Sequence, residues 1–167
     1  MGARESHDQR LARVVADSSA IIGLQRVERL DLLQKLFGEV LVPAAVVREV
    51  TYRVAALPDW IRARELTRPL PPEISERRLG PGESEAIALA FEMGIERVVI
   101  DDLRARVVAA RLGLEVVGAG ALLALAKRRG IIPAARPLLD AMLAKGFRIS
   151  PKVYADLLRL AGEESES

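Results

Sequence analysis

The residues of this sequence best suited to chemistry are carboxylates that follow apolar segments. Asp17 ends the segment Ala-Arg-Val-Val-Ala-Asp, and Asp101 and Asp102 follow Val-Val-Ile. Further carboxylates lie in expected helices, namely Glu49, Glu83 and Glu85. Carboxylates in one cleft repel each other, by about 4 kcal/mol for a pair about 4 Å apart at an effective dielectric of about 20. A divalent cation relieves that repulsion, and hard oxygen ligands favour Mg²⁺ or Mn²⁺.

Each of these carboxylates also has a purely structural interpretation. Asp17 suits a helix N-cap, Glu83 suits the positive end of a helix, and Glu49 suits a solvated helix face. Taken together they favour a shared site, because the carboxyl ends of parallel strands meet at one edge of a sheet.

Several other kinds of site are excluded by composition. The 167 residues contain no cysteine and one histidine, His7. These counts exclude disulfides, thiolate metal sites, cysteine nucleophiles and His-rich zinc sites, and they disfavour a Ser-His-Asp triad. The chemistry must therefore come from carboxylates, hydroxyls or a bound ion.

Positive charge is concentrated in part of the chain. The sequence has 25 Lys+Arg against 23 Asp+Glu, a net charge of +2, and three of those acids lie in residues 162–167. Residues 101–130 hold six basic side chains and three acidic ones. Such a stretch can contact phosphates or can be a solvated helix face.

Apolar runs and helical spacing alternate along the sequence. Strands are predicted at 12–17, 40–42, 97–100 and 115–117, with a weaker one near 60–66. Helices are predicted at 20–24, 27–38, 44–54, 83–93, 103–112, 120–129, 133–145 and 151–161. Five prolines and two glycines indicate that 57–82 is mostly loop.

This alternation predicts an α/β fold with a mainly parallel sheet covered by helices on both faces. Its site is expected beyond the carboxyl ends of the strands. The longest uncharged apolar run, Val116–Ala126, is shorter than the roughly 20 residues of a membrane span. The leader Met1–Arg10 lacks the apolar stretch of a signal peptide. We therefore expect no membrane association and a cytoplasmic location.

Four segments, in order and in register, resemble the PIN domain, and in particular its DUF3368 branch, which is related to VapC-type toxin nucleases. They are Val-Val-Ala-Asp17-Ser18-Ser19-Ala-Ile-Ile, Val-Pro43-Ala-Ala-Val-Val-Arg-Glu49, Gly80-Pro-Gly82-Glu83-Ser-Glu85-Ala-Ile and Val-Val-Ile-Asp101-Asp102-Leu-Arg-Ala-Arg106. The resemblance implies a three-layer α/β/α sandwich with a sheet of four to five strands. It also implies acids that hold Mg²⁺ or Mn²⁺ and cleave single-stranded or structured RNA.

The resemblance also divides the chain into parts. It implies a PIN-like domain over 12–146, and we expect a disordered or loosely ordered leader over 1–11 before it. A C-terminal helix over 147–161 is expected to pack on the domain, and residues 162–167 form an acidic tail, either a disordered end or an electrostatic mimic of RNA.

By position, Asp17 matches the first acid of the family, Glu49 the second and Glu85 the third. The fourth acid is Asp101 or Asp102, because the motif slides by one residue. Ser19 matches the hydroxyl that supports the first acid. One departure is that Ala119 follows Gly118, where the branch usually has threonine. The predicted phosphate contacts are Arg104, Arg106 and Lys127.

The implied reaction is metal-assisted hydrolysis of a phosphodiester. Asp17 and Asp102 (or Asp101) would bind the metal directly, Glu85 directly or through water, and Glu49 would position the attacking water or a second ion. The alternative is a PIN-like binding or scaffold module that keeps the acids but cleaves nothing.

Other functions fit less well. A haloacid-dehalogenase-type phosphatase needs a second aspartate where Ser19 stands, and a dinucleotide fingerprint at Gly118-Ala-Gly120 lacks its third glycine at Leu123.

The expected partners are RNA, a second copy of the chain and an antitoxin protein. The homodimer follows from the resemblance and from an apparent surplus of leucine in the late helices: Leu122, Leu125, Leu138, Leu139, Leu143, Leu157 and Leu158. We also expect repulsion within the metal-free acid cluster to raise at least one carboxyl pKa.

Overall fold

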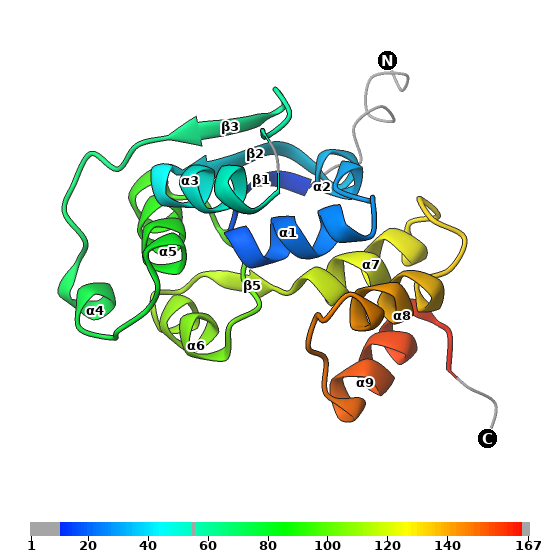
Figure 1. The fold of residues 1–167 in the computed structure, drawn as a ribbon. Helices are drawn as coiled ribbons and strands as arrows, with labels where there is room; N and C mark the ends of the chain where they lie inside the picture. The colour runs from blue at the N-terminus through cyan, green and yellow to red at the C-terminus, as the bar shows by residue number, and fades with distance from the viewer. Residues whose placement is uncertain (1–10, 55, 165–167) are drawn as a thin grey trace, which may run out of the picture.

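A central five-stranded sheet with helices on both faces makes up the described part of the chain (Figure 1). The computed structural model describes residues 11–54 and 56–164. The strands are β1 (Leu11–Ala16), β2 (Phe37–Pro43), β3 (Ile61–Arg64), β4 (Arg97–Val99) and β5 (Glu115–Val117). The helices are α1 (Ser18–Arg26), α2 (Asp31–Leu36), α3 (Ala44–Arg53), α4 (Pro72–Ser75), α5 (Pro81–Met93), α6 (Leu103–Arg111), α7 (Ala119–Arg128), α8 (Arg136–Ala144) and α9 (Pro151–Ala161).

The strand order is β3-β2-β1-β4-β5, and each neighbouring pair is parallel. Val14 of the central strand β1 pairs with Val40 of β2 on one side and with Arg97 of β4 on the other. The chain extends the sheet from β1 to β3 and then returns to the other side of β1. The direction of winding therefore switches between β1 and β4, and ligands of open α/β sheets bind beyond the carboxyl ends at such a switch.

The residues of β1 alternate between two apolar cores, because successive strand side chains point to opposite faces. Val14 and Ala16 pack in the core with α1, α2, α3 and α7, whereas Val15 packs in the core with α5 and α6. Both faces of the parallel sheet are thus covered by helices. The predicted three-layer α/β/α sandwich is confirmed.

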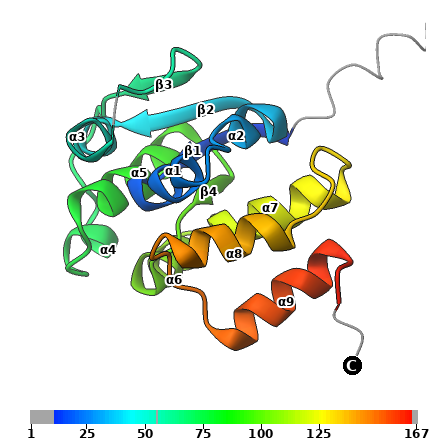
Figure 2. The same cartoon turned by 45° about the vertical axis from the view of Figure 1, so that its right-hand side comes forward.

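The two C-terminal helices extend the first core, and Figure 2 shows them alongside α7. Gly120 permits close packing of α9 on α7, because a Cβ there would lie 2.6 Å from Leu157 Cδ1. Most of the late leucines are covered within one chain. Leu122, Leu139 and Leu158 are at most 4% exposed, whereas Leu143 is 37% exposed. The apparent leucine surplus therefore gives no support to a homodimer.

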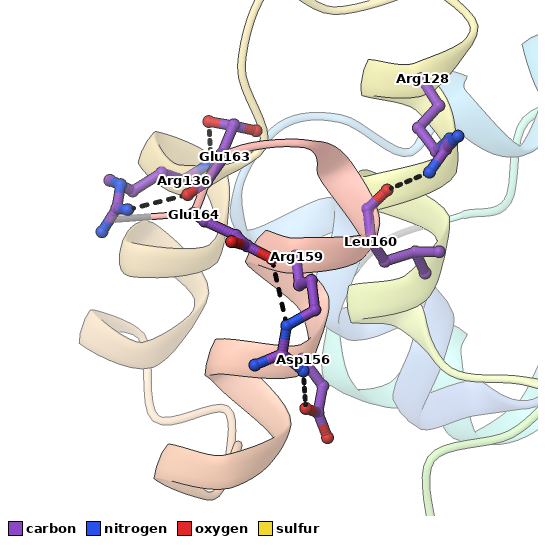
Figure 3. A network of polar contacts seen from close by, with 7 residues as sticks. All are labelled: Arg128, Arg136, Asp156, Arg159, Leu160, Glu163 and Glu164. Atoms are coloured by element: carbon purple, nitrogen blue, oxygen red, sulfur yellow. Dashed lines mark hydrogen bonds and ion pairs between the residues drawn. The ribbon is translucent and has the colours of Figure 1, made fainter. Parts of the chain in front are cut away.

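The described part of the predicted acidic tail is bound to the domain rather than loose. The Glu163 carboxylate accepts hydrogen bonds from Ala135 N at 2.6 Å and Arg136 N at 3.3 Å, at the start of α8. Glu164 forms an ion pair with Arg159 at 3.2 Å, and Figure 3 shows both carboxylates in one network. Within the expected acidic tail, Glu163 and Glu164 therefore have partners on α8 and α9. Residues 165–167 lie outside the described residues, as does the leader up to residue 10.

The observed elements follow the predicted ones closely, with three main differences. The helix predicted over 27–38 is the shorter α2, and Phe37 and Gly38, at its predicted end, belong to β2 instead. The loop predicted over 57–82 contains the short helix α4, which begins at Pro72, and α8 begins at Arg136 instead of residue 133. A proline in the first turn is compatible with a helix, because its missing N–H has no intrahelical partner there. No helix in the described part of the chain is long and apolar enough to cross a membrane.

Candidate active site

Five helix N-termini meet at the carboxyl edge of the sheet, and a carboxylate accepts a backbone hydrogen bond at each of them. The pairs are Asp17 with Ser18 N of α1 at 2.6 Å, Glu85 with Ala45 N of α3 at 3.2 Å, Glu49 with Gly82 N of α5 at 3.0 Å, Asp102 with Ala105 N of α6 at 2.9 Å and Asp101 with Ala119 N of α7 at 2.9 Å. Helix N-termini carry partial positive charge and free N–H groups, so this edge favours anions. The parallel topology explains why so many acids converge here.

Asp17 directly follows β1 at this edge and is buried, with 1% of its surface exposed. Its backbone N–H donates to Val99 O of β4 at 3.0 Å, which fixes it at the switch between the two strands. Its carboxylate also accepts from the Ser19 hydroxyl at 3.1 Å, at the position where the resemblance implies a supporting hydroxyl. The pKa of Asp17 is raised to about 7, chiefly by burial; the nearby charges of Glu83 and Glu49 also raise it, while the hydrogen bonds from Ser18 N and the Ser19 hydroxyl lower it.

Glu49 reaches this group from the second turn of α3. Its carboxylate accepts a short hydrogen bond from the Ser18 hydroxyl, and the same hydroxyl lies 3.3 Å from Asp17 Oδ1. Glu49 also occupies the space beside Gly82, where a Cβ would lie 2.8 Å from both carboxylate oxygens. Ser18 therefore links Asp17 to Glu49, and Gly82 makes room for that link.

The first turn of α5 presents Glu83, and not Glu85, to these acids. The Glu83 carboxylate accepts from Gly80 N at 3.0 Å. Burial raises the pKa of Glu83, the Gly80 hydrogen bond lowers it, and the charges of Asp102 and Glu49 raise it again. Glu85 follows Glu83 by two residues, so its side chain leaves α5 in a direction rotated by about 200° about the helix axis.

Glu85, the acid assigned from the sequence, accordingly has different neighbours. Its carboxylate accepts from Ala45 N and lies 3.9 Å from Arg48 Nη2. These contacts place Glu85 at the start of α3.

Asp101 and Asp102 follow β4 but differ in surroundings. Asp102 is exposed, caps α6 and contributes charge next to Glu83. Asp101 points toward the start of α7, where a Cβ on Gly118 would lie 2.8 Å from its Oδ1. Its Oδ2 is buried and has no hydrogen-bond partner among the described residues. Burial raises the pKa of Asp101 to about 6, although the Ala119 N–H and the Arg106 guanidinium lower it.

The three predicted phosphate contacts lie in different places. Arg106 lies beside Asp101 and lines a cavity of about 730 Å³ that also contains Arg148 and Ser150. Arg104 is exposed on α6. Lys127 lies in the last turn of α7, the end away from Asp101, and donates to Ala161 O at 3.4 Å. The structure thus brings Arg106 to the acids and gives Lys127 a partner at the C-terminus of α9.

Comparison with known protein families assigns the chain to one of them. The family model of DUF3368, described as PIN domain, matches residues 13–163. The chain belongs to this PIN domain family. Among solved structures, a PilT N-terminus domain protein from the hyperthermophilic archaeon Sulfolobus solfataricus is similar at 19% identity and a TM-score of 0.46, over 68% of this chain and 92% of that chain. No curated protein sequence matches the chain.

PIN domains are in general nucleases that bind nucleic acids and typically use a divalent metal, so membership indicates a nuclease-like function for this chain. The donor set fits Mg²⁺ or Mn²⁺ in kind, because it consists of carboxylates whose charges oppose one another. Among residues 11–54 and 56–164, however, no three acidic side chains lie close enough to hold a metal ion together.

Proposed function

We propose that this PIN domain is an endoribonuclease that hydrolyses RNA phosphodiester bonds with Mg²⁺ or Mn²⁺. One observation carries the proposal. Asp17, Glu49, Glu83 and Asp102 come from four separate elements to one edge of the sheet, where burial first, and then the charges of Glu49, Glu83 and Asp102, raise the pKa values of Asp17 and Glu83. Repulsion of this kind opposes folding and is relieved by a bound cation.

The proposed roles follow from the surroundings of each acid. Asp17 and Asp102 would hold the metal, and Glu83, in place of Glu85, is the third acid of the site. Ser18 and Ser19 fix the Asp17 carboxylate, and Ser18 couples it to Glu49, which positions the attacking water. When bound, the metal lowers the pKa of that water and neutralises charge that develops on the phosphate.

Arg106 and Asp101 lie side by side next to the proposed metal-binding acids. The Arg106 guanidinium beside Asp101 lines the 730 Å³ cavity, where it can contact a phosphate of the substrate. The N–H group of Ala119 is already occupied by Asp101 at 2.9 Å. Asp101 is therefore assigned to positioning the start of α7, and Asp102 to the metal.

The test is cleavage of a mixed RNA pool by the full chain with Mn²⁺, with Mg²⁺ and with chelator. Cleavage is expected only with metal, and Asp17→Asn is expected to abolish it. Asp31→Asn, at the start of α2 and half-exposed, is the matched control and should cleave like the wild type. A crystal soaked in Mn²⁺ should show an anomalous peak beside Asp17. Metal binding without cleavage of any RNA would favour the silent scaffold instead.

The expected assembly is proposed from the family resemblance. A homodimer would scatter light as twice the mass of 18.2 kDa at micromolar concentration. An antitoxin partner would suppress cleavage when it is added in equimolar amount. A monomer that cleaves RNA would reject the dimer and leave the nuclease proposal standing.

A further inference from the structure

One face of α3 combines an aromatic ring and two guanidinium groups beside the candidate active site. Arg48, Glu49, Tyr52 and Arg53 line a hollow of about 460 Å³. Residues three and four apart lie next to each other on a helix surface, so Tyr52 is adjacent to both Arg48 and Glu49. The volume lies within the range of pockets that take small organic groups, about 300–1,000 Å³.

Tyr52 is exposed far beyond what folding requires. Its exposed fraction is 91%, the highest among the large hydrophobic side chains of the described residues. The ring therefore covers none of the core. Tyr and Trp that are not buried in a protein commonly use their flat apolar ring to bind a partner.

The charges beside Tyr52 indicate an anionic partner. Arg53 is exposed, and the Arg48 side chain is 69% exposed although its Nη2 lies 3.9 Å from Glu85. Surface ion pairs of this length contribute little, so both guanidinium groups can contact phosphates. An aromatic ring between cationic side chains is the usual platform for single-stranded nucleic acid, because bases stack on the ring while the cations follow the backbone.

The platform is continuous with the acid cluster. Glu49, on the same face of α3, accepts hydrogen bonds from Ser18 and from Gly82 N within that cluster. A nucleotide stacked on Tyr52 therefore has its neighbour in the strand next to the acids. Bases inside a double helix are already stacked and cannot reach such a ring.

We infer that Arg48, Tyr52 and Arg53 form a subsite that stacks one unpaired base of the RNA substrate next to the scissile phosphodiester. The inference rests on the proposed ribonuclease function, and it specifies single-stranded RNA as the substrate class. Tyr52 acts on binding and positioning, while the acids carry out the hydrolysis.

The binding test uses fluorescently labelled 12-nucleotide single-stranded RNA, the same RNA annealed to its complement, and the wild-type full chain in chelator. Tyr52→Ala should weaken binding to the single strand about tenfold, Tyr52→Leu should weaken it as much, and Tyr52→Phe should bind like the wild type. Phe91→Ala is the matched control, because Phe91 is an exposed aromatic residue (53%) on α5 away from the acids. Arg48→Ala and Arg53→Ala should each lower the slope of log K against log salt by about 0.7.

A direct readout comes from RNA that carries 5-iodouridine, which cross-links to a stacked aromatic side chain on irradiation. The cross-link is expected in the tryptic peptide Glu49–Arg53 and should disappear in Tyr52→Leu. Equal affinity of Tyr52→Ala and wild type for the single strand would overturn the inference. So would a change in the oligomeric state of Tyr52→Ala with unchanged RNA affinity, which would make this face a protein interface.

The experiments distinguish failure of the Tyr52 subsite from failure of the ribonuclease proposal. Cleavage by wild type with an unchanged KM in Tyr52→Ala overturns the subsite and leaves the ribonuclease standing. Tyr52-dependent binding without metal-dependent cleavage overturns the ribonuclease and leaves the stacking of an unpaired base on Tyr52 as binding alone. If the chain binds single-stranded DNA as tightly as RNA and cleaves only DNA, both the RNA subsite and the ribonuclease proposal are overturned.

Discussion

The carboxylate of Glu49 occupies the space that a side chain on Gly82 would need. A Cβ at position 82 would lie 2.8 Å from both Glu49 oxygens, and Gly82 N donates to Glu49 Oε1 at 3.0 Å. The start of α5 can therefore approach α3 closely enough to bind this carboxylate. This close approach is the reason that position 82 requires glycine. The φ angle of Gly82 is not in the left-handed region, so backbone conformation alone does not require glycine there.

Gly82→Ala should consequently displace Glu49 and break its link to Ser18. We expect metal-dependent cleavage to fall at least about tenfold, because a misplaced catalytic carboxylate costs about that much or more. The melting temperature should fall as well, as α5 moves away from α3. Gly38→Ala on β2 is the control, since a Cβ there would lie 3.4 Å from Leu11 O, an ordinary contact. Unchanged cleavage in Gly82→Ala would show that Glu49 has no part in the reaction.

Glu83 and Glu85 give a matched pair on one helix. Glu83→Gln should abolish most cleavage and raise the melting temperature in chelator, because it removes a charge that Asp102 and Glu49 oppose. Glu85→Gln should keep cleavage, since its carboxylate bonds Ala45 N at the start of α3. Cleavage rates and melting curves of both variants, measured side by side, check the assignment. Loss of cleavage in Glu85→Gln alone would restore the assignment made from the sequence.

Much of the fold could be predicted from the sequence because β1, β2 and β4 each contain a compact apolar run that ends at, or just before, an acid or proline. The run before Asp17 and the run before Asp101 both became strands, and they are neighbours in the sheet. Convergence of the acids then followed from the parallel topology.

The details of the site depend on helix phase and on tertiary packing, which single-sequence patterns do not contain. Glu83 and Glu85 both lie in the first two turns of α5, and the rotation of α5 relative to α3 decides that Glu83 lies near Glu49 while Glu85 accepts from Ala45 N. Lys127 belongs to a basic run, yet its partner is the C-terminal carbonyl of a helix 34 residues away in sequence. Tyr52 carried no signal in the sequence, because nothing in its neighbourhood distinguished an exposed tyrosine from a buried one.

The C-terminal segment offers a stability test separate from catalysis. Glu163→Ala leaves Ala135 N and Arg136 N at the start of α8 without their acceptor and should lower the free energy of unfolding by about 1 kcal/mol. Glu164→Ala is the control, because its ion pair with Arg159 is mostly exposed and should contribute less than about 0.5 kcal/mol. Denaturant unfolding gives both values, and cleavage below the melting range should stay unchanged. Equal effects of the two variants would contradict the helix-capping role of Glu163.

Asp17 should make the stability of the metal-free protein depend on pH. Its pKa is raised from 3.8 to about 7 in the folded state, chiefly by burial, so the folded chain binds this proton more tightly than the unfolded chain does. Ionisation of Asp17 therefore opposes folding. The cost is absent below about pH 4, grows as the pH rises, and is complete above about pH 7.

Asp17→Asn removes this charge and should therefore gain stability relative to the wild type as the pH rises. Between pH 5 and pH 8 in chelator, the difference in free energy of unfolding should move in favour of the variant by on the order of 2 kcal/mol. At this chain length each 1 kcal/mol corresponds to roughly 2–4 °C in melting temperature. Asp101, whose pKa is raised to about 6, titrates in both proteins and cancels in the difference.

Paired melting curves of wild type, Asp17→Asn and Asp31→Asn at both pH values check this expectation. Partial burial raises the pKa of Asp31, but its bonds to Arg29 and Lys35 lower it overall, so it stays ionised in both states and its effect should not change between pH 5 and pH 8. Mn²⁺ should then raise the melting temperature of the wild type and not that of Asp17→Asn, because the stabilisation follows binding. If Asp17→Asn instead melts lower than wild type by the same amount at both pH values, Asp17 is a cap of α1 that folding requires. A cation that still stabilises that variant would bind elsewhere than at Asp17.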